Sequence, residues 1–415
     1  MPIPSIIDKI VLFKLFNVGL RILPLGLKFI LITTLSKYFD TAVYGDYSLI
    51  TATITISIFV LGLDFYNFSI RDILTEKDNI VEKLASTFFL YLFIYFFFFI
   101  IGSLLFRKIE FMHTYGLISV LGICVTEHLS QEIYRLHIAF KKVLLGNLIF
   151  FLRVSIWTGY ILVNLLFFDS KPTIEGILQL WLFSNIFSFV ISFLTLGKNL
   201  KKLIPFPKIE ISYLVKGLRI SFVFFLGTIA LKCIEYVNRY IVDYFLGSEE
   251  TGIFSFYANL ALIITVYVNA IVISFELPAL IEKTGSKDLN LHFKNFRNQM
   301  LKQIAFVSVL VIFITKPILI WQSVKVYDNY FPILFLLLLG VALMNFSLVY
   351  HFFLYILNKD STILRITLKS CFVNLILTIS LTFWGGLYGT ALAFFLTGLY
   401  MFFERRRNAI SANYD

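Results

Sequence analysis

Long apolar runs recur from one end of the sequence to the other and constrain the fold more than any other feature. One of them, residues 84–105, reads LASTFFLYLFIYFFFFIIGSLL and carries no charged side chain. Because a helix needs about 20 apolar residues to cross the ~30 Å hydrocarbon core of a bilayer, each run predicts a membrane-spanning helix. The runs are continuous and do not alternate polar with apolar residues, which excludes an outer-membrane barrel.

The composition agrees with this class. Hydrophobic residues make up 59% of the 415 residues and charged residues 15%, whereas soluble domains carry about 25% charged residues. A soluble enzyme, a disordered chain and a disulfide-stapled secreted domain are therefore excluded. The three cysteines, Cys124, Cys233 and Cys371, lie inside apolar runs without a CxxC or Cys/His cluster. We expect no metal site and no cofactor.

The pattern predicts an all-α polytopic membrane protein with twelve spans. The predicted spans are residues 10–35, 46–66, 84–105, 115–137, 143–167, 174–196, 213–240, 252–277, 302–320, 332–356, 363–383 and 386–403. Cations interrupt the first run and no small-residue cleavage site follows it, so we expect no cleaved signal peptide.

The loop charges support an even number of spans. With twelve spans both termini lie on one side, and the loops on that side carry most of the loop lysines and arginines. Such loops mark the cytoplasmic side of a membrane protein. We therefore expect both termini on the cytoplasmic side. Orientation and anionic headgroups account for the net charge of +11, and nucleic acid is not an expected partner. The basic segment 278–301 is expected to lie on the cytoplasmic headgroups.

A basic stretch with two prolines divides the chain in two. We expect an N-terminal lobe at 1–200 (spans 1–6), a basic linker at 201–212, and a C-terminal lobe at 213–415 (spans 7–12). A shift of 207 residues places Gly45 on Gly252 and Ser48 on Ser255, which suggests an internal duplication. Six spans per repeat give both repeats the same orientation, related by a pseudo-twofold axis along the membrane normal.

The first span carries an unusual stripe of positive charge. Lys14, Arg21 and Lys28 are spaced by seven residues, and a helix drifts only about 20° per seven residues, so they share one face. A charge in hydrocarbon is costly and needs water or a partner. The stripe therefore either lines a water-filled cavity or pairs with acids of other helices, such as Asp64 or Glu127.

Two further groups of charges lie inside spans. On the seventh span, Lys232, Glu235, Arg239 and Asp243 share a face, and pairs four residues apart can neutralise one another. A self-compensated network and contact with a ligand are both open. Arg153, ten residues into the fifth span, has no local partner and is a candidate for the cavity wall.

The fourth span ends in a polar cluster that contains Glu127, His128, Glu132 and Arg135. Perturbed histidine and carboxylate groups can relay protons, but a solvated helix end has the same composition, and we favour the solvated end. The acids that could exchange H⁺ or Na⁺ are Asp64, Glu127, Glu132 and Glu235.

These features together resemble the polysaccharide-biosynthesis flippases, the O-antigen unit flippases of the multidrug/oligosaccharidyl-lipid/polysaccharide exporter superfamily. The features are the twelve spans in two halves, the cations in the two opening helices, the turn Tyr44-Gly45-Asp46-Tyr47-Ser48 and the matching stretch DYFLGSEETGIFS at 243–255. The likeness covers essentially the whole chain.

The resemblance implies export of an undecaprenyl-pyrophosphate-linked oligosaccharide (an O-antigen or capsule repeat unit) across the bacterial inner membrane by alternating access. It implies a cationic central cavity, a monomer, and contact with membrane lipid and other polysaccharide-assembly membrane proteins. The expected substrate-binding cations are Lys14, Arg21, Lys28, Arg153, Lys232 and Arg239, and the expected coupling groups are Asp64, Glu127, His128, Glu132 and Glu235.

Two alternatives stay open. A small-molecule antiporter of the same superfamily would hold organic cations on embedded acids, whereas the first span here carries cations. A polysaccharide polymerase or ligase needs a large periplasmic loop, and the longest expected one, residues 316–331, is short. We find no phosphate loop, paired catalytic carboxylates or metal motif, and expect a protein that is not an enzyme.

Overall fold

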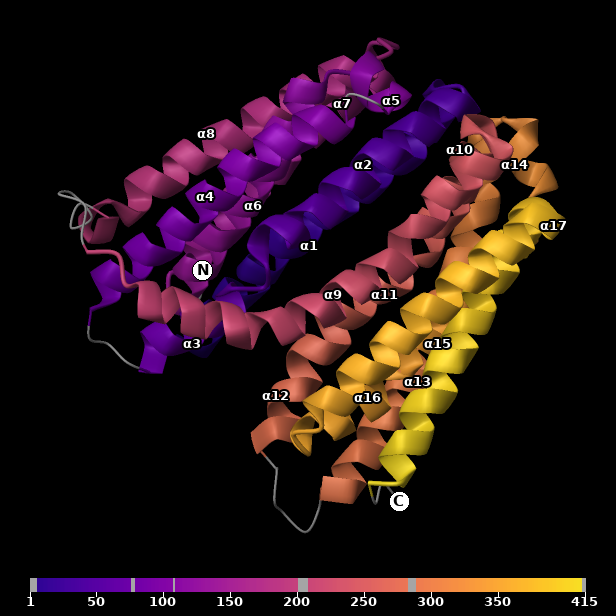
Figure 1. Cartoon of the computed structure of the whole chain (residues 1–415). Coiled ribbons are helices and arrows are strands. Elements are labelled where there is room, and N and C mark those ends of the chain that lie inside the picture. Colours follow the sequence, from indigo (N-terminus) through magenta and orange to yellow (C-terminus); the bar gives the residue numbers. More distant parts are fainter. Residues whose placement is uncertain (1–5, 76–78, 107–108, 201–207, 283–288, 413–415) are drawn as a thin grey trace. The chain divides into compact units, whose positions relative to one another are not determined.

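The computed structural model describes residues 6–75, 79–106, 109–200, 208–282 and 289–412. Within these ranges the regular elements are helices, as Figure 1 shows, and no strand occurs. The chain divides into two compact units. Unit 1 comprises residues 1–38 and 50–225, and unit 2 comprises residues 39–49 and 226–415.

The first eight helices carry most of unit 1. They are α1 (Ile6–Tyr38), α2 (Thr41–Gly62), α3 (Tyr66–Thr75), α4 (Ile80–Phe106), α5 (Glu110–Thr114), α6 (Leu117–Ala139), α7 (Val143–Phe167) and α8 (Ile174–Leu200). Helix α1 packs along α7, and α6 packs against α4, α7 and α8. The first turns of α2, up to Leu49, belong to unit 2. The next long helix, α9 (Ile211–Leu246), belongs to unit 1 as far as Phe225.

The remaining elements carry unit 2. They are α9 (Ile211–Leu246), α10 (Ser248–Ala261), α11 (Ile263–Tyr267), the π-helix η2 (Val268–Ile273), α12 (Ser274–Glu282), α13 (Leu289–Gln322), α14 (Lys325–Asn329), α15 (Ile333–Phe346), α16 (Leu348–Ile356) and α17 (Asp360–Ile410). Helix α15 packs along α17 and also contacts α10 and α13.

Ten stretches of the described residues are long and apolar enough to cross a membrane. The two further predicted spans have clear physical explanations. Helix α6 falls outside the ten because polar residues fill its second half, yet its neighbours bury it. Helix α17 counts once although its 51 residues would extend about 76 Å, and Gly386, at φ +56°, breaks it between the last two predicted spans. All twelve predicted spans therefore lie on helices.

The burial pattern is typical of a membrane protein, with small polar side chains buried and large apolar side chains exposed. On α8, the small polar residues Ser184, Asn185 and Ser188 are buried, while Phe183 and Phe187 are exposed. Small residues let helix backbones approach closely, and lipid favours the large apolar side chains on the outside. The exposed phenylalanines of α4 follow the same pattern.

The expectation for residues 278–301 was wrong for the part that the structure describes. Helix α13 begins at Leu289 and continues without interruption into the span, so the segment is not a separate surface helix. Phe293 and Phe296 are each 1% exposed, and the Phe293 ring lies 5.1 Å from that of Phe353 on α16. Residues 283–288 lie outside the described residues.

Two glycines matched by the internal repeat meet each other inside unit 2. A Cβ atom on Gly45 of α2 would overlap the carbonyl oxygen of Ser248, and one on Gly252 of α10 would overlap that of Thr41. The shift of 207 residues exchanges Thr41 with Ser248 and Gly45 with Gly252. The contact is therefore reciprocal, as expected of two repeat copies packed about a twofold axis.

Candidate functional site

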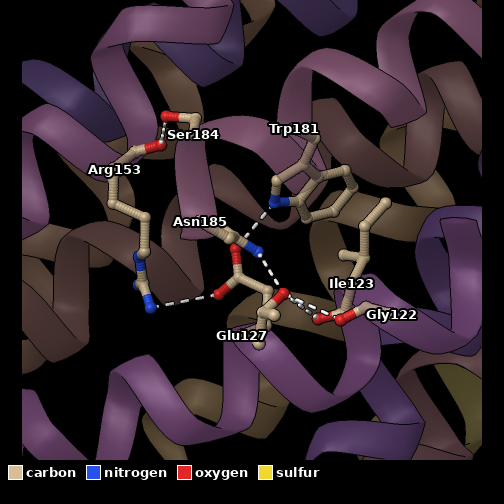
Figure 2. Close-up of polar contacts among 8 residues, drawn as sticks. Gly122, Ile123, Glu127, Arg153, Trp181, Ser184 and Asn185 are labelled. Carbon is tan, nitrogen blue, oxygen red and sulfur yellow. Dashed lines mark hydrogen bonds and ion pairs between the residues drawn. The ribbon is translucent and has the colours of Figure 1, made fainter. Parts of the chain in front are cut away.

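A buried ion pair joins α6 to α7 in unit 1. The Arg153 guanidinium lies 3.2 Å from a carboxylate oxygen of Glu127 (Figure 2), and the two residues are 6% and 7% exposed. Neither side chain reaches bulk water, so each depends on the other for compensation of its charge. Arg153 was predicted to line a cavity, and Glu127 was predicted to neutralise a cation of another helix. In the structure these two residues pair with each other.

Helix α8 holds the carboxylate in place. The Trp181 indole nitrogen donates a hydrogen bond of 2.7 Å to Glu127, and the Trp157 ring stacks on the Trp181 ring with centroids 5.1 Å apart. In Figure 2, Trp181 and Arg153 approach the two oxygens of Glu127 from different helices. A charge-assisted bond from a rigid, buried indole fixes the carboxylate orientation.

A second cation lies beside this pair. The Lys28 ammonium on α1 sits 4.9 Å from the centre of the Trp181 ring and interacts electrostatically with both Glu127 and Arg153. Lys28 is partly exposed, unlike Arg153. The Glu127 carboxylate therefore pairs with Arg153 and also attracts Lys28 electrostatically, and the cation–π contact gives Lys28 further stabilisation.

The arginine is incompletely bonded. Its Nε and Nη1 atoms are buried and make no hydrogen bond that satisfies normal geometry, although Nη1 forms the ion pair. The backbone carbonyl of Arg153 accepts a hydrogen bond of 2.7 Å from Ser184 on α8, which anchors this turn of α7. A positioned guanidinium with spare donors suits an anionic group with several oxygens.

Arg21, the central cation of the predicted stripe, has different surroundings from Lys28. Arg21 is exposed on the helix surface. Lys14 lies within α1, but its side chain is outside the described part of the chain. One turn before Arg21, Asn17 accepts a hydrogen bond of 3.2 Å from Asn147 on α7. Of the two stripe residues whose side chains the structure describes, Lys28 and Arg21, it brings Lys28 to the Glu127–Arg153 pair.

The charges of α9 form a separate cluster in unit 2. Lys232 bonds Glu235 at 2.6 Å, and Arg239 is buried with its guanidinium 2.9 Å from the side-chain oxygen of Asn259 on α10. Arg239 also donates to the backbone carbonyl, not the carboxylate, of Glu235. Lys232 rather than Arg239 thus pairs with the Glu235 carboxylate, which is one of the internal pairings open to this helix face.

The expectation of a solvated end for α6 was wrong. His128 is 1% exposed and Glu132 is 8% exposed. The His128 Nδ1 atom lies 2.6 Å from the Tyr95 hydroxyl, and the Tyr91 hydroxyl donates to Glu132 at 3.0 Å. Sequence periodicity missed this because both tyrosines come from α4.

Arginine and a second acid complete this α6 cluster. Arg135 forms an ion pair with Glu132 and lies 3.5 Å from the centre of the Tyr66 ring on α3. Burial raises the pKa of the Tyr66 hydroxyl above its ordinary value, so Tyr66 stays protonated. Asp64 is buried at φ +50° in the turn between α2 and α3 and interacts with Glu132.

Two residues that bear on these sites were missed. Trp181 gave no signal in the sequence beyond being a tryptophan in an apolar run. Arg405 follows the last predicted span, where a cation is expected in the cytoplasm, yet it is 2% exposed and donates a hydrogen bond of 2.8 Å to Ser347. Its position two residues after the last predicted span was the available signal.

Solved transporter structures share this fold. An inward-facing multidrug resistance MATE family transporter of the MOP superfamily superposes with a TM-score of 0.75 at 11% identity, covering 93% of this chain and 94% of that one. The lipid II flippase MurJ in an inward closed conformation gives a TM-score of 0.75 at 15% identity, covering 96% and 87%. A MOP superfamily transporter from Pyrococcus furiosus, whose binding pocket is described as having reversed polarity, gives 0.60 at 11%, covering 96% and 94%.

At these identities the likeness concerns the fold: a two-lobed, all-helical membrane transporter. No curated protein sequence matches the chain. A family described as polysaccharide biosynthesis proteins matches residues 15–284, which include α2 to α12 and most of α1. On that match, which spans more than half of the sequence, the chain belongs to the polysaccharide biosynthesis protein family.

Proposed function

We propose that this protein flips an oligosaccharide linked to undecaprenyl pyrophosphate, an O-antigen or capsule repeat unit, across the bacterial inner membrane by alternating access. Both termini would lie in the cytoplasm. Family membership and a multi-pass transporter fold support transport in polysaccharide assembly. The substrate's anionic pyrophosphate would be recognised by cations of the protein.

The observation that carries the proposal is the group formed by Arg153, Lys28 and Glu127. Arg153 is buried, pairs with Glu127 and retains donors without a hydrogen bond, and Lys28 feels the same carboxylate electrostatically. Arginine binds phosphate oxygens in a forked geometry, and the low dielectric of a buried site strengthens that bond. In this conformation Glu127 acts as the partner of Arg153, and the substrate phosphate would replace it when the site opens.

The neighbouring cations suit the approach of such a substrate. Arg21 is exposed one helical heptad before Lys28 on α1, so a phosphate could pass between them along one face. Lys232 and Arg239 form the candidate site of unit 2. In this structure Lys232 bonds the Glu235 carboxylate and Arg239 bonds the side-chain oxygen of Asn259. Two of the proteins with this fold support a lipid-linked or anionic substrate: one is a lipid II flippase, and the other is a transporter whose binding pocket is described as having reversed polarity.

The test is the sidedness of lipid-linked oligosaccharide in a bacterial strain that lacks this protein. We expect the repeat unit to accumulate facing the cytoplasm and surface polysaccharide to disappear, with both defects reversed by the wild-type gene. Normal arrival of the unit in the periplasm would refute the proposal. In that case, increased sensitivity of the strain to small toxic cations would identify an antiporter instead.

A further inference from the structure

Unit 1 contains an apolar cavity that none of the groups described above requires. It has a volume of about 150 Å³ and lies among α3, α4, α6 and α8. Its lining includes Ile73 of α3, Leu84 and Phe88 of α4, Leu136 of α6 and Phe193 of α8. Glu132 and Tyr91 form its polar end.

The cavity opens on the outer surface of the unit. Phe88 and Phe193 at its rim are 42% and 50% exposed, and other exposed apolar residues of α4, such as Phe89 and Leu92, lie beside them. In a multi-pass membrane protein such a surface contacts lipid hydrocarbon. The medium in front of the opening is therefore lipid chains rather than water.

Three of the polar side chains of the lining, those of Thr87, Tyr91 and Glu132, are already bonded. Glu132 receives hydrogen bonds from Tyr91 and Arg135, and the Thr87 hydroxyl donates to the carbonyl of Lys83. A buried water needs two to four polar partners, and an apolar cavity of about 150 Å³ stays dry and binds small apolar molecules. Water is therefore a poor occupant of this cavity.

We propose that the end of an acyl chain from a bilayer phospholipid occupies this cavity. A space of this size holds an apolar group about as large as benzene, which corresponds to a short segment of hydrocarbon chain. Phospholipid is the solvent at the opening, so mass action favours its chains over those of any scarce lipid. The bound chain end packs against the Glu132 cluster and keeps that carboxylate away from water.

The test uses the full-length protein in phospholipid nanodiscs that contain phosphatidylcholine with a diazirine at the end of one acyl chain. After irradiation, mass spectrometry locates the labelled residues. We expect labelling concentrated on Phe88, Leu136 and Phe193. Leu84→Trp, which fills the cavity, should cause at least a several-fold loss of this labelling, and the smaller change Leu84→Phe should cause a partial loss.

Leu92→Trp is the matched control. Leu92 lies about two turns after Leu84 on α4, is exposed and does not line the cavity. It should leave the labelling unchanged. Wild-type labelling that is no stronger at the lining residues than along the rest of α4 would overturn the proposal. Labelling of the cavity by a diazirine-bearing undecaprenyl phosphate, but not by the phospholipid, would overturn it as well and would assign the cavity to an isoprenoid chain. Circular dichroism and elution volume confirm that each variant is folded.

Discussion

Several buried charged residues in the described part of the chain have a specific companion. Arg153 has Glu127, Lys83 lies 2.7 Å from Asp72, and Arg239 has the amide of Asn259. Desolvating a charge costs several kcal/mol, so such residues persist only where they are compensated or used. The Glu127–Arg153 pair differs from a purely structural pair because Lys28 adds a second positive charge beside one carboxylate.

A double substitution separates a structural role of this pair from a role in binding. Glu127→Gln keeps the acceptor for Trp181 but leaves Arg153 uncompensated, and breaking a buried pair costs about 3–5 kcal/mol. Adding Arg153→Met removes the uncompensated charge and should restore most of the thermal stability in detergent. Surface polysaccharide should stay absent in cells that carry the double variant, because the phosphate-binding arginine is gone.

The test compares two properties of the same double variant, its thermal stability and the surface polysaccharide of the cells that carry it. If the double variant regains both stability and surface polysaccharide, Arg153 serves only to neutralise Glu127, and the binding role is wrong. Arg407→Ala provides the control, because the Arg407–Glu404 pair lies on the surface with Arg407 72% exposed. Exposed pairs contribute about 0–1 kcal/mol, so this variant should behave as wild type in both assays.

At the scale of single residues, the sequence predicted which types of residue matter better than it predicted their partners. Lys28, Arg153 and Glu127 were all singled out, yet the pairing of Arg153 with Glu127 depends on α6 and α7 lying together. Spacing along one helix identifies neighbours at three and four residues. It is silent about Trp181 on α8 and about Tyr91 and Tyr95 on α4, which determine the environments of Glu127, Glu132 and His128.

Among the elements, the crossing of α2 and α10 depends on the absence of two side chains. A Cβ at Gly45 or Gly252 would overlap a backbone carbonyl, which cannot move aside as a side chain can. We expect Gly45→Ala and Gly252→Ala to destabilise the protein by about 1–3 kcal/mol, the typical cost of overpacking. A thermal melt in detergent measures this.

Gly159 on α7 is the matched control for the crossing, since a Cβ there would meet nothing within 4 Å. Alanine has a higher helix propensity than glycine by about 1 kcal/mol, so Gly159→Ala should be neutral or stabilising. Equal melting temperatures for Gly45→Ala and Gly159→Ala would show that the close crossing does not form.

The break in α17 supports a similar comparison between adjacent residues. Gly386 has φ +56° and ψ −140°, a conformation essentially restricted to glycine that costs other residues about 1–3 kcal/mol, whereas Gly385 has an ordinary φ. No atom lies within 4 Å of a Cβ built at either position. Gly386→Ala should therefore lower the melting temperature and Gly385→Ala should not. An equal effect of both would contradict a backbone break at Gly386.

Most of the elements were predictable because the apolar runs are long and their boundaries are marked by charge. The short helices α3, α5 and α14 were missed because helices of 5 to 10 residues are too short to show a periodic pattern. The start of α13 was misjudged because Phe293 and Phe296 form an amphipathic stripe that suits a membrane surface and a protein interior equally well. Only α16, which packs against them, decides between the two.

For the whole molecule, the distribution of loop charge predicts the orientation in the membrane. Ser411 follows the basic end of α17, and Ser170 lies in the exposed loop between α7 and α8. In a variant without the three native cysteines, Ser170→Cys should react with an impermeant maleimide in spheroplasts. Ser411→Cys should react only after the membrane is disrupted. The opposite result would invert the topology.

The account of the whole molecule as a flippase is tested most directly with purified protein. Proteoliposomes that contain a fluorescent oligosaccharide linked to undecaprenyl pyrophosphate allow the fraction exposed outside to be measured with a membrane-impermeant quencher. We predict that wild-type protein moves the lipid between leaflets and that the Glu127→Gln/Arg153→Met variant, equally incorporated and folded, does not. Transbilayer movement that matches protein-free liposomes, or is equal for wild type and variant, would contradict the central claim.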